Sequence, residues 1–290
     1  MSPALPPLYF NDKVSPSTSA AVAIPPEVLH CIVDYSTWGV LAKLASVQTS
    51  WSQIMYDAAD GSTQSKWDLA QAMLEGTSGL EVNETKAMEL LLSLSQVETQ
   101  NDIPVTDVSA TNGPCFAPAM KQIATCYLEG VGVQKPDADK GLAWLKAAHD
   151  VGADVDAAHQ VAVIYEYGSF GAEHDVVAAA AWFRKAALTG HMEAMAELGL
   201  CYELGCGVEQ SDEEALEWYI KAAEKGHLTA KYSVGEAFEE ARGVPQSDEE
   251  ACLWYFKAAI EGDEDSRRAL RRLEDIARIV VPGVAALLNA

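Results

Sequence analysis

The stretch "WFRKAALTGH" at residues 182–191 recurs further along the chain as "WYIKAAEKGH" at 218–227 and as "WYFKAAIEGD" at 254–263, at a constant step of 36 residues. A looser copy, "AWLKAAHDVG", lies upstream at 143–152. Self-similarity at a period of this size is the signature of a repeat protein. In such a protein each unit buries its apolar face only against its neighbours.

A second element lies ahead of each copy. It reads "AMKQIATCYLEGVGV" at 119–133, "AHQVAVIYEYG" at 158–168, "AMAELGLCYELGCGV" at 194–208 and "AKYSVGEAFEEARGV" at 230–244. In the third copy, Ala194, Leu198 and Tyr202 recur at a spacing of four residues, which puts them on one face of a helix. Gly205 can end that helix, and Ser211 or Asp212 can cap the next one. The sequence therefore predicts an all-α fold of paired helices.

The pattern A-x-x-x-L-G-x-x-Y-x-x-G-x-G-V, followed by A-x-x-W-Y-x-K-A-A-x-x-G, resembles the Sel-one-like repeat, a relative of the tetratricopeptide repeat. Four full copies occupy 117–264, and a degenerate copy precedes them at 69–95. The resemblance implies an α-solenoid of stacked helix pairs, closed by a C-terminal capping helix at 265–290. Residues 96–116 are polar and aperiodic, which is typical of an inserted loop or a disordered stretch.

By analogy with tetratricopeptide repeats, the first helix of each pair lines a concave face that binds a protein partner. The residues predicted to lie on this face are Lys121, Gln122, Thr125, His159, Gln160, Val163, Glu197, Leu200, Tyr232, Ser233 and Glu236.

The N-terminal part of the chain has a different character. Residues 1–23 are rich in proline, serine and threonine, and we predict a disordered tail. Residues 24–68 form a short, strongly apolar segment that resembles an F-box. The resemblance rests on "IPPEV" at 24–28 and on Ile32, Tyr35, Leu41, Leu44, Val47 and Trp51. The segment departs from the F-box pattern at Ile24, Ser36, Gln48 and Ser50. A plain helical cap on the solenoid is the alternative interpretation.

An F-box docks on the Skp adaptor of cullin–RING ubiquitin ligases, so the resemblance implies a Skp-type adaptor and a cullin complex as partners. The residues that would contact the adaptor are Ile24, Pro25, Leu29, Leu41, Leu44 and Val47. The rest of the chain would then select the protein that receives ubiquitin. The alternative function is a Sel-one-like scaffold unrelated to ubiquitin.

No pattern in the sequence predicts catalysis, a metal site or a cofactor. His191 and His227 occupy the same repeat position, which favours a structural role. The six cysteines form no Cys-x-x-Cys pair, so we expect reduced and mostly buried thiols. The G-x-G strings of the loops follow a helix rather than a strand, which excludes the dinucleotide-binding interpretation. We therefore expect a protein without enzymatic activity.

The net charge of −23 restricts the classes of partner. Residues 117–270 hold 13 basic and 28 acidic side chains, a balance of −15. Such a surface repels phosphate backbones, so we expect neither nucleic acid nor a membrane as partner, whereas basic peptides would be attracted. An acidic surface that serves solubility alone is the open alternative. With no apolar run of about 20 residues and no signal peptide pattern, we expect a cytoplasmic or nuclear protein.

Overall fold

The computed structural model describes residues 63–77, 82–105, 116–281, 283, 284 and 287. The chain divides into two compact units, Met1–Ser65 and Lys66–Ala290, and nearly all described residues belong to the second. The predicted tail at 1–23 and the F-box-like segment up to residue 62 lie outside the described residues. The six residues predicted to contact a Skp adaptor lie there too.

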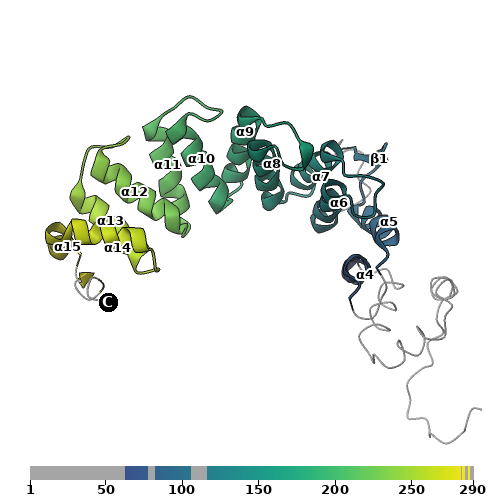
Figure 1. Cartoon of the computed structure of the whole chain (residues 1–290), viewed down its shortest axis with the longest axis horizontal. Coiled ribbons are helices and arrows are strands. Elements are labelled where there is room, and N and C mark those ends of the chain that lie inside the picture. The colour runs from purple at the N-terminus through teal and green to yellow at the C-terminus, as the bar shows by residue number, and fades with distance from the viewer. Residues whose placement is uncertain (1–62, 78–81, 106–115, 282, 285–286, 288–290) are drawn as a thin grey trace, which may run out of the picture. The chain divides into compact units, whose positions relative to one another are not determined.

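The described part of the chain is built from helix pairs that follow one another in a curved row within the second unit (Figure 1). This confirms the predicted all-α solenoid. The helices are α4 (Thr63–Glu75) and α5 (Glu84–Ser95), α6 (Ala117–Glu129) and α7 (Ala138–Asp150), α8 (Val155–Tyr167) and α9 (Val176–Leu188), α10 (Met192–Leu204) and α11 (Asp212–Glu224), α12 (Leu228–Glu240) and α13 (Asp248–Ala259). A single 3-10 turn, η2 (Ser169–Gly171), interrupts the loop between α8 and α9.

Side chains at fixed repeat positions start the helices. The hydroxyl of Ser211 accepts a hydrogen bond from the Glu214 N–H at the start of α11, as predicted. His191 caps α10 in the same way, because its Nδ1 accepts from the Ala194 N–H at 3.1 Å. His227 does so for α12. The two histidines therefore have the structural role that their shared position predicts.

Two glycines allow close approaches between elements. A Cβ on Gly199 would lie 2.8 Å from the ring of Tyr219, so its absence lets α10 and α11 pack tightly. Gly207, in the loop after α10, has a φ of +72°, and a Cβ there would lie 2.0 Å from the carbonyl oxygen of Val176. The loop after α10 is thereby pressed against Val176 at the start of α9, the second helix of the preceding pair.

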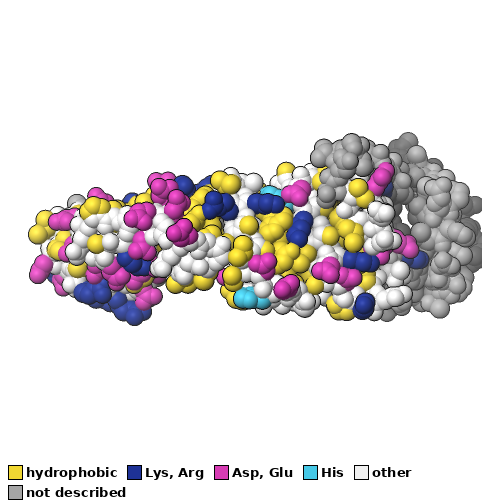
Figure 2. Space-filling view, turned by 90° about the horizontal axis from the view of Figure 1, so that it is seen from above, with side chains coloured by type: hydrophobic (Ala, Val, Ile, Leu, Met, Phe, Trp, Pro, Cys, Tyr) yellow, Lys and Arg dark blue, Asp and Glu magenta, His cyan; other side chains and the backbone are white. Residues whose placement is uncertain are grey.

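The core combines alanines with larger aliphatic and aromatic side chains. Trp144, Phe183 and Tyr255 are fully buried between alanine-rich helix faces. Trp182 and Trp254 are only half-buried and pack at the edge of the core. The Nζ of a lysine lies over each of these two rings, 3.6 Å from the ring centroid in both cases. Figure 2 shows such a surface, on which basic side chains lie among hydrophobic ones over the middle of the molecule.

Part of the 96–116 segment is ordered as a small hairpin. β1 (Thr99–Gln100) pairs antiparallel with β2 (Ile103–Pro104). The carbonyl oxygen of Asp102 accepts a 3.0 Å hydrogen bond from the indole N–H of Trp144 in α7. Burying Trp144 requires an acceptor for this N–H, and the hairpin supplies it. Residues 106–115 lie outside the described residues.

Both ends of the repeat array differ from the predicted boundaries. α4 begins at Thr63, ahead of the predicted start at residue 69. At the other end, the predicted single capping helix is two helices, α14 (Glu264–Arg272) and α15 (Glu274–Val280). They are separated by Leu273, whose φ of −99° and ψ of 26° interrupt the helix. No helix in the described ranges has the length and apolar character needed to span a bilayer.

Candidate partner-binding face

The first helix of each pair has one face that points away from the pair's own core. Residues spaced by four, three and four positions form it, because this spacing follows one side of a helix. We call this face the first-helix stripe. In α8 it consists of Asp156, Gln160, Val163 and Tyr167, and in α10 of Glu193, Glu197, Leu200 and Leu204.

Three residues predicted to lie on the binding face make contacts inside the array instead, two of them between repeats and one within its own helix. Lys121 forms a 2.9 Å ion pair with Asp154, the capping residue of the next first helix. The ring of His159 stacks on His191 with 4.4 Å between centroids. Tyr232 donates a 2.8 Å hydrogen bond to Glu236 of its own helix. These side chains hold neighbouring parts of the array together and offer little surface to a partner.

The other predicted residues differ in how far they are exposed. Gln122, Thr125, Val163, Glu197, Ser233 and Glu236 are half-buried, whereas Gln160 and Leu200 are exposed. Thr125 donates to the carbonyl oxygen of Lys121 at 3.1 Å. The prediction that this face binds a partner stays a prediction, and its exposed part is smaller than the sequence indicated.

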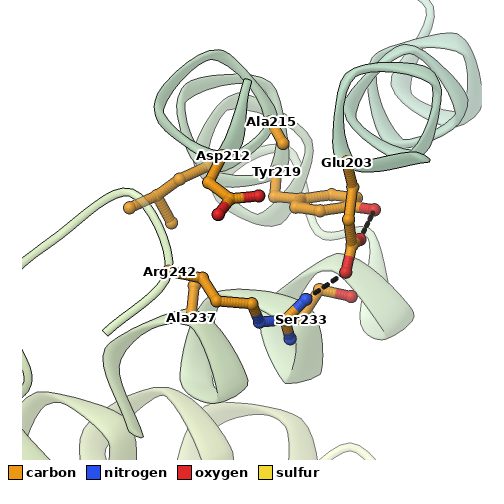
Figure 3. Close-up of a pocket in the computed structure, with 8 residues that line it drawn as sticks. Glu203, Asp212, Ala215, Tyr219, Ser233, Ala237 and Arg242 are labelled. Carbon is orange, nitrogen blue, oxygen red and sulfur yellow. Dashed lines mark hydrogen bonds and ion pairs between the residues drawn. The ribbon is translucent and has the colours of Figure 1, made fainter. Parts of the chain in front are cut away.

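A cluster of charges lies where α10, α11 and α12 meet (Figure 3). Arg242 pairs with Glu203 of the preceding repeat, with Glu240 at 3.1 Å and with Glu236 at 3.6 Å. The Tyr219 hydroxyl donates to Glu203 at 2.7 Å. We call Glu203, Glu236, Glu240 and Arg242 the arginine cluster. Its one guanidinium is thus engaged by three carboxylates, so Arg242 is not available to pair with a ligand.

Part of this arrangement recurs one repeat later. The Tyr255 hydroxyl donates to Glu239 at 2.8 Å, and Arg272 of α14 lies 2.7 Å from the same carboxylate. Burial raises the pKa of both tyrosines above the ordinary value, and the bonded carboxylates raise it further. Two successive repeats therefore share one arrangement, in which a glutamate near the end of the first helix accepts a hydrogen bond from a tyrosine and pairs with an arginine.

One repeat before the arginine cluster, the matching positions hold different residues. Leu200 stands in place of Glu236, Leu204 in place of Glu240, and Cys206 in place of Arg242. Leu200 is 39% exposed, Leu204 is 61% exposed and Cys206 is exposed. Tyr167, at the end of α8, is 71% exposed. We call Tyr167, Leu200, Leu204 and Cys206 the leucine patch.

Two half-buried glutamates border the leucine patch. Glu166 matches Glu203 in position, but Phe183 stands where Tyr219 would donate to it. Burial raises the pKa of Glu166, against the opposing effects of a hydrogen bond with Tyr167 and the nearby His174. Burial also raises the pKa of Glu197, and the charge of Glu166 raises it further. Within the described residues neither carboxylate forms an ion pair with a lysine or an arginine.

Sequence reasoning missed Tyr167, Leu204 and Glu166. A signal was present, because the stripe position of Tyr167 and Leu204 is held by Glu129 and Glu240 in the flanking repeats. When the repeats are aligned position by position, these two repeats have an apolar residue where the repeats on either side have a glutamate.

The described residues contain no group of three or more histidine, cysteine or acidic side chains placed to hold a metal ion. Three cysteines are buried thiols. Burial raises the pKa of Cys126 and Cys252 to about 11 and that of Cys201 to about 12, which keeps them protonated and unreactive.

Comparison with known proteins identifies the repeat. The Sel1 repeat family matches residues 63–95, 117–149, 155–191, 193–227 and 229–263. The predicted degenerate copy is thus a fifth repeat. No F-box family matches the chain, and the comparison with curated proteins gave no match.

Two solved structures have a similar fold. One is a protective antigen of uropathogenic Escherichia coli strains with an SLR fold, which is 20% identical with a TM-score of 0.62. That similarity covers 87% of this chain and 52% of the antigen, so the chain spans about half the antigen's length. The other is a Sel1 repeat protein from Oxalobacter formigenes, 22% identical with a TM-score of 0.55, covering 83% of this chain and 88% of that one. Because the five matched segments cover more than half of its residues, the chain belongs to the Sel1 repeat family.

Proposed function

We propose that this chain is an adaptor that holds a partner protein on the first-helix stripe and performs no catalysis of its own. The observation that carries the proposal is the leucine patch. Leu200 and Leu204 are exposed one helical turn apart on a stripe that begins with Glu193 and Glu197. Exposed apolar side chains grouped in this way usually mark an interaction site on a soluble protein.

Such an adaptor would act by tethering. Two proteins bound to one chain meet at a raised effective concentration, so a reaction between them is accelerated without any covalent step on the adaptor. A stacked array of helix pairs suits this task, because it offers an extended surface along its length.

The F-box resemblance of residues 24–51 favours a more specific role. In this role the chain is the substrate-recruiting subunit of a Skp–cullin–F-box ubiquitin ligase, with a Skp adaptor bound at Pro25 and Leu29 among others. The protein would then work in the cytoplasm or the nucleus. The alternative is a scaffold unrelated to ubiquitin, in which the N-terminal helices only cap the solenoid.

Affinity capture of the full chain from cells of its own source tests the adaptor role. We expect a protein captured by the natural chain to be lost when Leu200→Ser and Leu204→Ser are combined. The matched control combines Leu188→Ser and Ile260→Ser, two apolar residues at the C-terminal ends of second helices that are 72% and 58% exposed. Loss of capture in the control alone would place the partner on the second helices and contradict the proposal.

Binding to a purified Skp adaptor tests the ubiquitin role separately. We expect Pro25→Ala combined with Leu29→Ala to abolish this binding while the thermal melt of the repeats is unchanged. Failure of the natural chain to bind the Skp adaptor of its own source would rule out the ubiquitin role and leave the scaffold.

A further inference from the structure

The leucine patch occupies the repeat positions that hold the arginine cluster one repeat later. Its residues at these positions are uncharged, but the glutamate that matches Glu203 is still present as Glu166. In the arginine cluster, Arg242 neutralises Glu203 of the preceding repeat. In the leucine patch, the residue in the place of Arg242 is Cys206, which has no positive charge and a short side chain. Glu166, in the place of Glu203, therefore has no ion pair with an arginine among the residues that the structure describes.

The two loops have the same backbone conformation, so the comparison of side chains is direct. The Cys206 N–H donates to the Cys201 carbonyl oxygen at 2.9 Å, and the Arg242 N–H donates to the Ala237 carbonyl oxygen at 2.9 Å. The preceding residues, Gly205 and Ala241, are both left-handed, with φ of 70° and 57°. An arginine at position 206 would thus be aimed at Glu166 as Arg242 is aimed at Glu203.

We infer that the leucine patch binds a peptide segment of a partner protein in which a lysine or arginine lies beside apolar side chains. The inference rests on the adaptor function proposed above and adds the chemistry of the partner. The cation of the peptide takes the position that Arg242 has in the next repeat and pairs with Glu166. The apolar residues of the peptide cover Tyr167, Leu200 and Leu204.

Charge decides between this occupant and others. Glu166 and Glu197 are half-buried carboxylates that repel each other, which raises the pKa of Glu197 further. A cation placed between them relieves this repulsion, and in a partly buried site the attraction is screened less than at the surface. An acidic peptide or a second copy of this acidic chain would add to the repulsion. A neutral apolar peptide would leave both carboxylates covered and unpaired, which is costly.

The substitution Cys206→Arg gives the sharpest test, because the introduced side chain should block the binding site for the peptide. The new guanidinium would pair with Glu166 and occupy the position meant for the peptide's cation. The matched control is Leu188→Arg, which adds the same charge at an exposed position in the last turn of α9, outside the first-helix stripe. A second variant, Leu204→Ser, removes an apolar contact from a side chain that is 61% exposed and so costs the fold little.

The probes are three synthetic peptides of one length. The first alternates leucine and arginine, the second has glutamate in place of arginine, and the third has serine in place of leucine. Their binding to the full chain is measured by fluorescence anisotropy at physiological salt, and each variant is checked by a thermal melt. We expect the leucine–arginine peptide alone to bind. Cys206→Arg and Leu204→Ser should each weaken it about tenfold or more, the effect of losing one good contact, and Leu188→Arg by much less.

Equal weakening by Cys206→Arg and Leu188→Arg would mean attraction to the net charge alone and would overturn the inference. If the serine–arginine peptide binds as tightly as the leucine–arginine peptide, the inferred contact between apolar peptide residues and the leucine patch is wrong. If no peptide binds, while Leu200→Ser with Leu204→Ser still abolishes capture of a cellular protein, this inference is wrong and the adaptor function stands. If the stripe variants leave capture intact but the leucine–arginine peptide binds as expected, the proposed function fails and the binding chemistry stands.

Discussion

The hydroxyl of Tyr219 lies 2.7 Å from Oε2 of Glu203 and donates a hydrogen bond to it. The bond joins the second helix of a pair to the end of its first helix, and the same carboxylate also pairs with Arg242 of the next repeat. Glu203 therefore links two successive pairs. The matching residue, Glu166, lacks both contacts, and the chain exposes apolar side chains at that place.

Tyr219→Phe should lower the free energy of unfolding by about 1–2 kcal/mol, because the bond to a charged acceptor is lost and Glu203 stays half-buried. The ring itself fits, since the matching residue of the preceding repeat is Phe183. Urea denaturation measures the change. Tyr167→Phe is the control, because the Tyr167 hydroxyl also bonds a glutamate, Glu166, but at a position that is 71% exposed, and it should change stability by less than about 0.5 kcal/mol. Equal effects of the two substitutions would show that the Tyr219 bond adds nothing to stability.

Glu197→Gln should make the protein more stable at pH 7. Folding raises the pKa of Glu197, so in the window above the ordinary glutamate value of about 4.3 the folded state binds more protons than the unfolded state. The free energy of unfolding of the natural chain therefore falls as the pH rises through this window. Glutamine removes that penalty, and its advantage should shrink as the pH is lowered to about 4.

Chemical denaturation at a series of pH values measures this dependence, with Glu209→Gln in an exposed loop as the control. If Glu197→Gln is less stable than the natural chain at pH 7, the carboxylate has a favourable partner and is not available for a peptide's cation.

Ala241→Gly should stabilise the protein by about 0.5–1 kcal/mol. Ala241 ends α12 with a φ of 57°, in the left-handed region that glycine adopts without steric cost. The gain in the folded state exceeds the extra freedom that glycine gives the unfolded chain. Gly205→Ala, the reverse change at the matching position of α10, should destabilise. A thermal melt in which both substitutions shift the midpoint in the same direction would contradict this explanation.

Trp218→Ala should cost about 3–5 kcal/mol by leaving a cavity in the core cluster that includes residues of α8 to α12. Because each repeat contacts only its neighbours, we expect the loss of hydrogen-exchange protection to be largest in the repeat of Trp218 and the two beside it. Protection in α6 and α7 should be reduced least. A uniform loss across all described helices would instead mean that the repeats unfold as one cooperative block.

The fold could be predicted because the same helix-capping and helix-ending residues recur at the same position in several repeats. The helix end at Gly205, the cap at Ser211 and the tight contact at Gly199 all follow from residues at fixed repeat positions, whereas the cap at His191 was predicted only as a structural role. The hairpin at 99–104 occurs once, so no second copy reveals it. It is held by a hydrogen bond from the indole N–H of Trp144, a residue 42 positions further along the chain, to the carbonyl oxygen of Asp102. Likewise, nothing in the local sequence indicates the interruption at Leu273.

The candidate site could be predicted only in part. The sequence placed the candidate site on the first helices, which stays a prediction, but Lys121 and His159 contact neighbouring repeats through Asp154 and His191. Such contacts between repeats depend on the distance between successive helices, which periodicity alone does not give. The leucine patch became visible when each of its residues was compared with its counterpart in the arginine cluster.

Site-specific photo-cross-linking tests the central claim most directly. Benzoylphenylalanine is placed at position 200 on the first-helix stripe in one variant, and at position 188 on α9 in another, in cells of the protein's own source. Both positions are exposed, so both probes can reach a bound protein. The adaptor account predicts a covalent adduct with a partner protein from position 200 and none from position 188. Adducts from position 188 with none from position 200 would contradict it.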